Sequence, residues 1–292
     1  MPGSTIKGPR LAGVLGQPVA HSLSPVIHGH WFAAHGIDGA YVRLPVDPAD
    51  LAAVVATLPK MGFSGVNVTI PHKLAMVELV DERDPAASRM GAVNTVLFQE
   101  DGRSMGLNTD GLGFAQALIE AVPAFGDPQA VAQMGPVVLL GTGGAAQAVA
   151  SALIDLGITG LRLSNRTQSR AEELAALAAG WTDRPVSVIP WAERAAALGG
   201  AGLLVNCTSL GMRGQPDLEV AIDDLPLTSP VFDIVYNPLH TPLLQAAAER
   251  GQPVIDGLGM LLHQAVPGFC HWGGVTPLVD QALRTAVLDR LK

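Results

Sequence analysis

Short apolar runs alternate with longer alanine-rich segments along most of the chain. The run 11–16, LAGVLG, is typical of a buried strand, and the segment 24–36 after it is typical of a helix. In this helix we expect Ser24 as the N-cap, Pro25 as the first helical residue and Gly36 as the stop. Such alternation predicts parallel βαβ units.

The alternation continues through the first part of the chain. A further strand and helix are expected at 40–46 and 47–58. The stretch 67–73, NVTIPHK, then ends an apolar strand abruptly in polar residues. There we expect Pro71 to start a helix that carries Lys73 in its first turn. From 92 to 107 the period shortens to a predicted hairpin, with its turn at 101–102.

A second series begins after the Pro- and Gly-rich stretch 122–136. Its expected strands are 137–141, 161–165, 186–190, 202–209 and 231–235, and helices follow the first three and the last. The chain closes on two helical stretches near 258–271 and 276–291. A chain of 292 residues suits two domains. We therefore predict two α/β units with a break near 110–135.

High hydropathy makes a membrane protein worth testing, because hydrophobic residues are 48% of the chain and charged residues 15%. The best candidate span, 137–158, is interrupted by glycine and polar residues, so we expect no membrane segment. The first ten residues lack the apolar core of a signal peptide. Cys207 and Cys270 stand far apart without a partner motif, which favours a reducing, cytoplasmic compartment.

The net charge argues against nucleic acid as a partner, and the spacing of the histidines argues against a metal ion. The net charge of −8 argues against nucleic acid, and it means that an anionic ligand must be captured by local donors. His28 and His30 lie two apart, which on a helix points them in different directions, and no carboxylate stands nearby at ligand spacing. We expect no metal site.

The stretch 137–157 contains a dinucleotide-binding pattern. Gly141, Gly143 and Ala146 form G-x-G-x-x-A directly between a predicted strand and a predicted helix. In this context the glycines allow a tight turn and close approach of a pyrophosphate, and the helix N-terminus faces the anion. The alternative is a tight turn that holds no ligand.

The end of the following strand indicates which nucleotide binds. An NAD site usually carries Asp or Glu there, but this chain has Asn165, Arg166 and Thr167, with Arg170 close behind. A guanidinium suits the 2′-phosphate of NADP(H), and no carboxylate is present to repel it. Arg166 as a solvated helix-start residue is the alternative.

Polar residues gather at the strand–helix junctions of the first unit, where open α/β sheets bind ligands. The candidates are Ser22, Ser24, Thr69, Lys73, Asn94 and Asp110. This set of hydroxyls and amides, with one cation and one carboxylate, fits a small, hydroxyl-rich, anionic molecule. Ser24 as a helix cap, Asn94 as a hairpin residue and Asp110 as a cap are the alternatives. Lys73 opposes the dipole of its expected helix, which favours a functional role with Asp110 as its partner.

Nine motifs in order carry a family resemblance: HSLSP, NVTIPHK, GAVNT, NTDG, GTGGAA, NRT, NCTSLGM, DIVYNP and DGLGMLLHQA. From about residue 10 to its end the chain resembles shikimate dehydrogenase of the aromatic amino-acid (chorismate) pathway. The resemblance implies reversible NADPH-dependent reduction of 3-dehydroshikimate to shikimate. It also implies a mostly parallel-sheet substrate domain, 1–109 plus 257–292, and a Rossmann-type NADP-binding domain, 110–256.

The resemblance also implies roles for single residues. Lys73 and Asp110 would be the general acid/base pair, and Ser22 with Ser24 would bind the substrate carboxylate. The ring and its hydroxyls would be held by Thr69, Asn94, Asp110, Tyr236 and Gln264. NADP(H) would be held by Gly141, Thr142, Gly143, Gly144, Ala145, Asn165, Arg166, Thr167, Gln168, Ser169 and Arg170, with Ile234 and Gly257 near the nicotinamide.

Two positions depart from the family pattern. Gly29 stands where Asn is usual, which would loosen the helix behind Ser22 and Ser24, and Ser209 stands where Pro is commoner. A quinate/shikimate dehydrogenase with relaxed substrate or cofactor use is the rival enzyme, and a non-catalytic ligand sensor is the rival of another class. The sequence leaves open a homodimer, the degree of NADP preference and the extent of domain closure.

Overall fold

The structure is a computed structural model that describes residues 9–291. The residues before Pro9, part of the stretch in which no signal peptide is predicted, lie outside the described residues. The chain forms two compact units, one built from the residues up to Thr109 and from Gln264 onward, the other from Asp110–His263.

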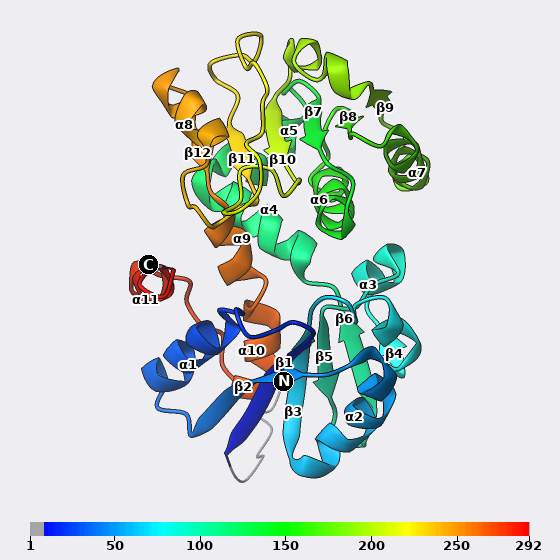
Figure 1. Cartoon of the computed structure of the whole chain (residues 1–292), viewed down its shortest axis with the longest axis vertical. Helices are drawn as coiled ribbons and strands as arrows, with labels where there is room; N and C mark the ends of the chain where they lie inside the picture. Colours follow the sequence, from blue (N-terminus) through cyan, green and yellow to red (C-terminus); the bar gives the residue numbers. More distant parts are fainter. Residues whose placement is uncertain (1–8, 292) are drawn as a thin grey trace. The chain divides into compact units, whose positions relative to one another are not determined.

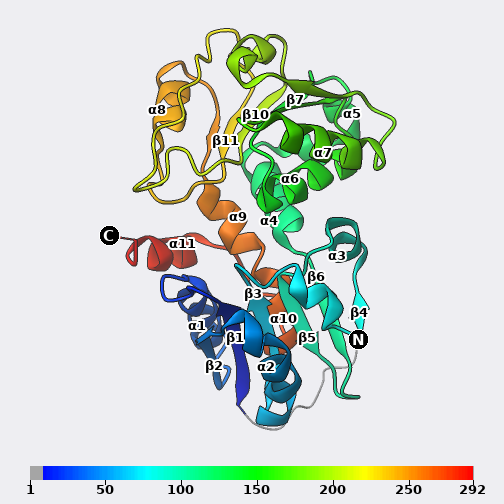
Figure 2. The ribbon, with the colours of Figure 1, turned by 45° about the vertical axis from the view of Figure 1, so that its right-hand side comes forward.

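The first unit contains one mixed sheet (Figures 1 and 2). Its strands are β1 (Arg10–Gly16), β2 (Gly39–Pro45), β3 (Phe63–Val68), β4 (Glu82–Arg83), β5 (Thr95–Phe98) and β6 (Ser104–Leu107). Its α-helices are α1 (Ser24–Ala34), α2 (Leu51–Thr57), α3 (Pro85–Met90), α10 (Val266–Gly273) and α11 (Gln281–Leu288). Short 3-10 helices lie at Pro48–Asp50, Leu58–Met61 and Ala75–Glu78.

The strand order of this sheet is β2-β1-β3-β5-β6-β4. Strand β1 runs parallel to both β2 and β3, while β5 is antiparallel to β3 and to β6. The predicted hairpin is therefore confirmed as β5–β6, and Gly102 in its turn has a φ of +88°. Strand β5 makes the sheet mixed, and the remaining pairs are parallel, in line with the expected mostly parallel sheet.

Neighbouring residues of β3 face opposite sides of the sheet. A Cβ on Gly65 would meet the Trp272 ring of α10 at 3.0 Å, so this face is packed directly against that helix. The next residue, Val66, belongs to an apolar cluster with Leu51 and Val55 of α2. Helices thus cover both faces, which explains why β3 reads as an almost continuous apolar run.

The second unit contains a fully parallel sheet. Its strands are β7 (Val137–Leu140), β8 (Leu161–Ser164), β9 (Val186–Ile189), β10 (Leu203–Asn206), β11 (Val231–Asp233) and β12 (Val254–Ile255). Its α-helices are α4 (Asp110–Ala121), α5 (Pro128–Val131), α6 (Gly144–Asp155), α7 (Gln168–Ala179), α8 (Pro242–Glu249) and α9 (Gly257–His263). Short 3-10 helices lie at Pro123–Gly126, Trp191–Glu193 and Ala196–Leu198.

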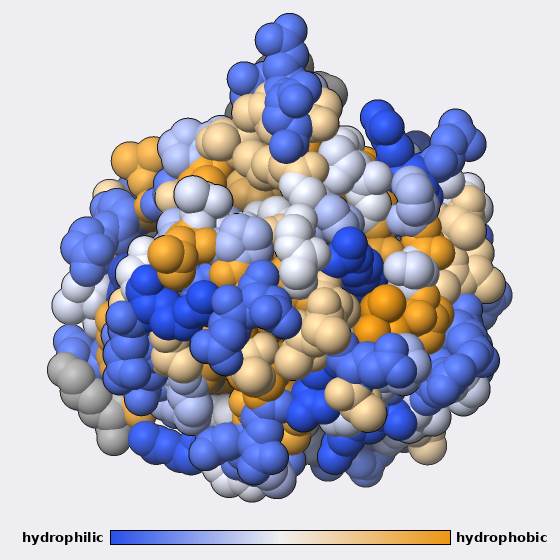
Figure 3. Space-filling model, turned by 90° about the horizontal axis from the view of Figure 1, so that it is seen from above, coloured by the Kyte–Doolittle hydropathy of each residue, from blue (hydrophilic) through white to orange (hydrophobic). Residues whose placement is uncertain are grey.

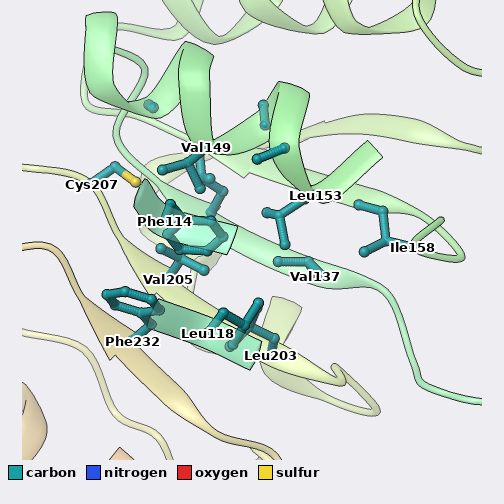
Figure 4. Close-up of a cluster of buried hydrophobic side chains, with 14 of the residues drawn as sticks. Phe114, Leu118, Val137, Val149, Leu153, Ile158, Leu203, Val205, Cys207 and Phe232 are labelled. Atoms are coloured by element: carbon teal, nitrogen blue, oxygen red, sulfur yellow. The ribbon is translucent and has the colours of Figure 1, made fainter. Parts of the chain in front are cut away.

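The order β9-β8-β7-β10-β11-β12 is that of a Rossmann fold, with the strand order reversing between β7 and β10. Val137 and Leu139 of β7 join the apolar cluster beneath α4 and α6 (Figure 4), while Val138 and Leu140 join a second cluster on the other face. The predicted two-unit α/β architecture with a Rossmann-type second unit is confirmed. Helix α9 packs on α4 and groups with the second unit, so the structural division falls after His263, whereas the prediction placed it before Gly257.

Several local predictions were wrong. Leu23, not Ser24, is the N-cap of α1, so Ser24 is the first helical residue and its side chain does not cap. No helix starts at Pro71; the residues after Thr69 form turns that lead into the 3-10 helix Ala75–Glu78, so the dipole argument for Lys73 fails. The expected helix after β9 is replaced by two 3-10 turns. The expected helix near 258–271 is divided into α9 and α10.

No helix within residues 9–291 is long and apolar enough to cross a membrane. On the face shown in Figure 3, polar and apolar side chains are interspersed.

Candidate functional site

The loop after β7 has two kinds of glycine. Gly141 has a φ of +94°, and a Cβ there would meet the backbone of Cys207 and the side chain of Thr208 at 2.9 Å, so glycine is required. Gly143 and Gly144 have open space beside them, and Gly143 has an ordinary φ of −76°. Neither packing nor backbone conformation explains these two glycines, whereas close approach of a pyrophosphate does.

Other features of this loop also fit a dinucleotide. The N-cap Gly143 offers no side chain to the first N–H groups of α6, which leaves them for an anion. The hydroxyl oxygen of Thr142 is buried without a hydrogen-bond partner among the described residues. Gly144 begins α6, Ala145 follows it, and Ala146 is fully buried, as close strand–helix packing requires. The residues of the glycine loop therefore fit the predicted cofactor.

The turn after β8 presents polar groups to solvent. The Asn165 side-chain amide donates to the Thr167 carbonyl at 2.9 Å, which fixes the turn before α7. The residues after it are exposed: Arg166, Thr167, Gln168, Ser169 and Arg170. Glu172, the nearest following carboxylate, accepts from the Gln168 side chain at 2.8 Å. Two guanidinium groups without an acidic residue between them suit a 2′-phosphate.

A buried polar brace joins the ends of β10 and β11. Asp233 is 0% exposed and accepts from the Asn206 side chain at 2.9 Å, the Val235 N–H at 3.0 Å and the Thr241 hydroxyl at 2.7 Å. Burial raises the pKa of Asp233, and these three hydrogen bonds oppose the shift. Asn206 in turn accepts from the Thr208 N–H and hydroxyl at 3.0 and 2.7 Å. Because Thr208 packs against Gly141, the brace also supports the glycine loop.

Of the residues expected near the nicotinamide, Ile234 follows β11 and Gly257 begins α9. A Cβ on Gly257 would meet the Ile234 carbonyl oxygen at 2.0 Å, so the structure brings these two residues together and requires glycine. The Gly257 N–H donates to the Val235 carbonyl at 3.2 Å. Tyr236 is half-buried, and burial raises its pKa. Cys207 is buried, which raises the pKa of its thiol and makes a nucleophilic role unsuitable.

In the first unit, the two serines of HSLSP lie together at the start of α1. The Ser22 hydroxyl donates to the Ser24 hydroxyl at 3.2 Å, and the Ser24 N–H donates to the Ser22 hydroxyl at 3.3 Å. The Arg43 guanidinium donates twice to the Ser22 carbonyl, at 2.6 and 3.1 Å. This arrangement sets two hydroxyls side by side and can bind a carboxylate.

The turn after β3 is held at both ends. The Thr69 N–H donates to the Leu15 carbonyl at 2.9 Å, and the buried His72 ring contacts the Val46 carbonyl at 2.7 Å. The carbonyl of half-buried Lys73 accepts from the Val93 N–H at 2.9 Å. This hydrogen bond holds the backbone of Lys73 beside the residue that precedes Asn94.

Asn94 is buried and ties the hairpin to the chain leading into α4. Its carboxamide oxygen accepts from the Thr109 N–H at 2.9 Å, and its amide donates to the Thr109 hydroxyl at 3.0 Å. Asp110, the next residue, opens α4. Consecutive residues 93 and 94 thus hold the backbone of Lys73 and the residue directly before Asp110.

Four polar residues of this region are absent from the predicted set: Tyr41, Asn67, Thr95 and Thr109. All four are buried and hydrogen-bonded to one another or to Asn94. Of these four, Asn67 could have been found from the sequence, because a polar residue inside an apolar strand such as VNVTI is unusual. Gln264 is half-buried between α9 and α10. Among residues 9–291, no group of three or more His, Cys, Asp or Glu could hold a metal ion.

Comparisons with known proteins identify close relatives. Residues 14–96 match the family model described as shikimate dehydrogenase substrate binding domain. Shikimate dehydrogenase (NADP+) from Paramagnetospirillum magneticum is 53% identical over 280 residues, which cover 96% of this chain and 98% of that protein.

Solved structures of related dehydrogenases are also similar to this chain. Quinate dehydrogenase from Corynebacterium glutamicum in complex with NAD has a TM-score of 0.87 at 32% identity, covering 96% of this chain and 99% of that one. Shikimate 5-dehydrogenase from Thermus thermophilus in complex with NADP(H) and shikimate has a TM-score of 0.80 at 35% identity, with coverages of 96% and 99%.

Proposed function

The chain belongs to the shikimate dehydrogenase family, as its motifs predict, and from this premise we propose that it catalyses the reversible NADPH-dependent reduction of 3-dehydroshikimate to shikimate. It is an NADP-dependent oxidoreductase of aromatic amino-acid biosynthesis. The relative at 53% identity carries the name shikimate dehydrogenase (NADP+) and is matched over almost its whole length.

The cofactor is held by the second unit. When bound, NADPH supplies the hydride. Gly143 and Gly144 leave room for its pyrophosphate, and Arg166 with Arg170 bind the 2′-phosphate. The remaining residues of this site are Gly141, Thr142, Ala145, Asn165, Thr167, Gln168, Ser169, Ile234 and Gly257.

The substrate is held by hydroxyls and amides. Ser22 and Ser24 bind its carboxylate through neighbouring hydroxyls at the start of α1, with the Ser22 hydrogen turned from Ser24 to the carboxylate. The ring hydroxyls are bound by Thr69, Asn94, Asp110, Tyr236 and Gln264. Because the net charge of −8 repels an anion, affinity depends on these local donors and on Lys73.

Lys73 and Asp110 perform the proton transfer. In the reductive direction the Lys73 ammonium donates a proton to the carbonyl oxygen as negative charge develops there, and Asp110 holds the amine in position. One observation supports this pairing most directly: Val93 holds the Lys73 backbone, and Asn94 holds the residue next to Asp110. The segment that carries Lys73 and the segment that precedes Asp110 are far apart in sequence. Both are hydrogen-bonded to consecutive residues just before β5.

The direct test is NADP+ reduction followed at 340 nm, with shikimate as the sole second substrate. We expect turnover that depends on both compounds. Absence of turnover with folded protein that binds NADP+ would overturn the proposed reaction and favour a ligand sensor.

A quinate/shikimate dehydrogenase with relaxed specificity is the second candidate, favoured by the likeness to a quinate dehydrogenase solved with NAD. The exposed Arg166 and the absence of an acid at residues 165–170 favour the first candidate. Assays of quinate and shikimate with NAD+ and NADP+ separate the two.

We place the enzyme in the cytoplasm on the basis of its two unpaired cysteines. Assembly as a homodimer is a further candidate property, which light scattering after gel filtration decides.

A further inference from the structure

Asn67 lies near the end of β3 with 6% of its surface exposed, and its side chain stands between two hydroxyls. The Tyr41 hydroxyl donates to its carboxamide oxygen at 2.6 Å, and its amide nitrogen donates to the Thr95 hydroxyl at 2.9 Å. Both bonds join residues more than 25 positions apart. A buried amide that uses its two ends in this way fixes the orientation of both neighbours.

Each neighbour leads to a different part of the proposed substrate site. Tyr41 hydrogen-bonds to the Ser24 side chain, which lowers the tyrosine pKa against the larger upward effect of burial. Thr95 donates to the Asn94 carboxamide oxygen at 3.1 Å. Asn67 therefore connects the serine pair with the Asn94–Thr109 pair.

The direction of every hydrogen bond in this chain follows from one backbone donor. The Thr109 N–H can only donate, so the Asn94 atom that faces it must be oxygen. Thr95 must then donate to that oxygen and accept from Asn67, so the Asn67 atom facing Thr95 must be nitrogen. Its oxygen consequently faces Tyr41, which must donate.

The polarity extends to the serines. With the hydrogen of Tyr41 directed at Asn67, Tyr41 can only accept from Ser24. Ser24 then accepts from Ser22, in agreement with the 3.2 Å bond between their hydroxyls, and Ser22 keeps the one hydroxyl hydrogen of the pair that can turn to the carboxylate. The Asn67 side chain thus fixes which group donates and which accepts in every hydrogen bond of the chain from Thr109 to Ser22.

We propose that Asn67 is a positioning residue of this site, which orients the Ser22–Ser24 pair through Tyr41 and the Asn94–Thr109 pair through Thr95. The inference rests on the proposed function, because its consequences are measured in the shikimate reaction. It assigns Asn67 no contact with substrate.

The test is the substitution Asn67→Asp. The introduced side chain, when ionised, can only accept, so Thr95 loses its donor and two acceptors face each other. We expect kcat/KM for shikimate to fall about ten- to a hundredfold, through both KM and kcat, while the Kd for NADP+ is unchanged. When protonated, the introduced carboxyl has one donor and one acceptor end, as asparagine has. The ratio of Asn67→Asp to wild-type activity must therefore rise as the pH falls.

The groups around Asn67 do not add a titration of their own to this pH profile. The His28 ring stacks on Tyr41 with centroids 4.1 Å apart, and burial lowers its pKa to about 3, with Asn67 opposing only in part. Burial raises the pKa of Tyr41 well above its usual value. Neither group titrates in an assay between about pH 5 and 8. Any pH dependence that the variant shares with the wild type is removed by taking the ratio.

Thr95→Val provides a second variant. It keeps the shape of the side chain but removes the hydroxyl that accepts from Asn67 and donates to Asn94. Its effect and that of Tyr41→Phe on kcat/KM should combine to less than their product, because both act through Asn67. Gln252→Leu is the control, a buried amide of the second unit that donates to the Pro226 and Ser229 carbonyls. We expect it to reduce stability without changing KM or kcat.

The outcomes separate the two proposals. A wild type without shikimate activity defeats the proposed function. An active wild type with Asn67→Asp activity within twofold at all pH values, or with a ratio that does not change with pH, defeats the positioning role. If Asn67→Asp does not fold, independent, fully multiplicative effects of Thr95→Val and Tyr41→Phe defeat it instead.

Discussion

Replacement of Asp233 by alanine tests how far the second unit depends on its buried brace. Three donors converge on this carboxylate: the Asn206 amide, the Val235 N–H and the Thr241 hydroxyl. All of them are buried, so none gains water when the acceptor is removed. Each buried donor left without an acceptor costs about 1–3 kcal/mol, so the three together should cost at least about 3 kcal/mol.

We expect Asp233→Ala to lower the free energy of unfolding by at least about 3 kcal/mol. Because the brace supports Thr208 against Gly141, the Kd for NADP+ should also rise. Urea denaturation followed by circular dichroism and by tryptophan fluorescence measures the first quantity, and coincidence of the two curves checks two-state unfolding. Isothermal titration calorimetry with NADP+ measures the second.

The control is Asp280→Ala, which removes the cap of α11. Asp280 accepts from the Leu283 N–H at 2.8 Å near the surface, so its loss should cost about 1 kcal/mol. An Asp233→Ala variant no less stable than Asp280→Ala, with unaltered NADP+ binding, would refute the brace.

Asp233→Asn adds a pH dependence whose sign follows from burial. Burial raises the pKa of Asp233 in the folded protein above 3.8, while the unfolded value stays near 3.8. Between these values the folded state holds a proton that the unfolded state has lost, so wild-type stability falls as the pH rises through this window. The asparagine variant lacks this loss. Its stability deficit relative to wild type should therefore shrink with rising pH; a deficit that grows would contradict the direction of the shift.

Three further substitutions test separate parts of the site. Lys73→Ala should lower kcat by about 10²–10⁴-fold with little change in KM, and a large rise in KM with kcat preserved would show that Lys73 binds without transferring a proton. Arg166→Ala should reduce the preference for NADPH over NADH about ten- to a hundredfold, and an unchanged ratio of kcat/KM values would remove its role at the 2′-phosphate. Gly29→Ala should raise stability by about 0.5–1 kcal/mol at unchanged KM, because Gly29 is an exposed residue within α1 with open space beside it; loss of stability would reveal a contact that the structure does not have.

The sequence predicted most where local pattern determines structure. Strand, glycine loop and helix at 137–155 follow from hydrophobic period and glycine spacing, and the hairpin turn follows from Asp101 and Gly102. Prediction failed where a distant contact overrides a local preference. Ser24 has the right residue type for a cap, but its hydroxyl is engaged by Ser22 and Tyr41.

The missed residues have the same physical cause. Nothing in the spacing of Tyr41, Asn67 and Thr95 indicates that their side chains meet, because the sheet brings them together from three strands. A tyrosine and a threonine are also ordinary strand residues. Asn67 alone is unusual in an apolar strand, and its partners become known when the strand order is known.

Both units solve the same problem with the same chemistry. Loops at the ends of strands must be held rigidly in a low-dielectric interior, where a charged group without full pairing is expensive. Asparagine accepts and donates without charge, and here Asn67 with Asn94 and Asn206 with Asp233 occupy such strand ends. With only 15% charged residues, the chain can then keep Lys73, Asp110 and Arg166 for the charged roles of the proposed reaction. The amides of Asn67 and Asn94 do not titrate, so the pH dependence of activity should report the reacting groups rather than this part of the scaffold.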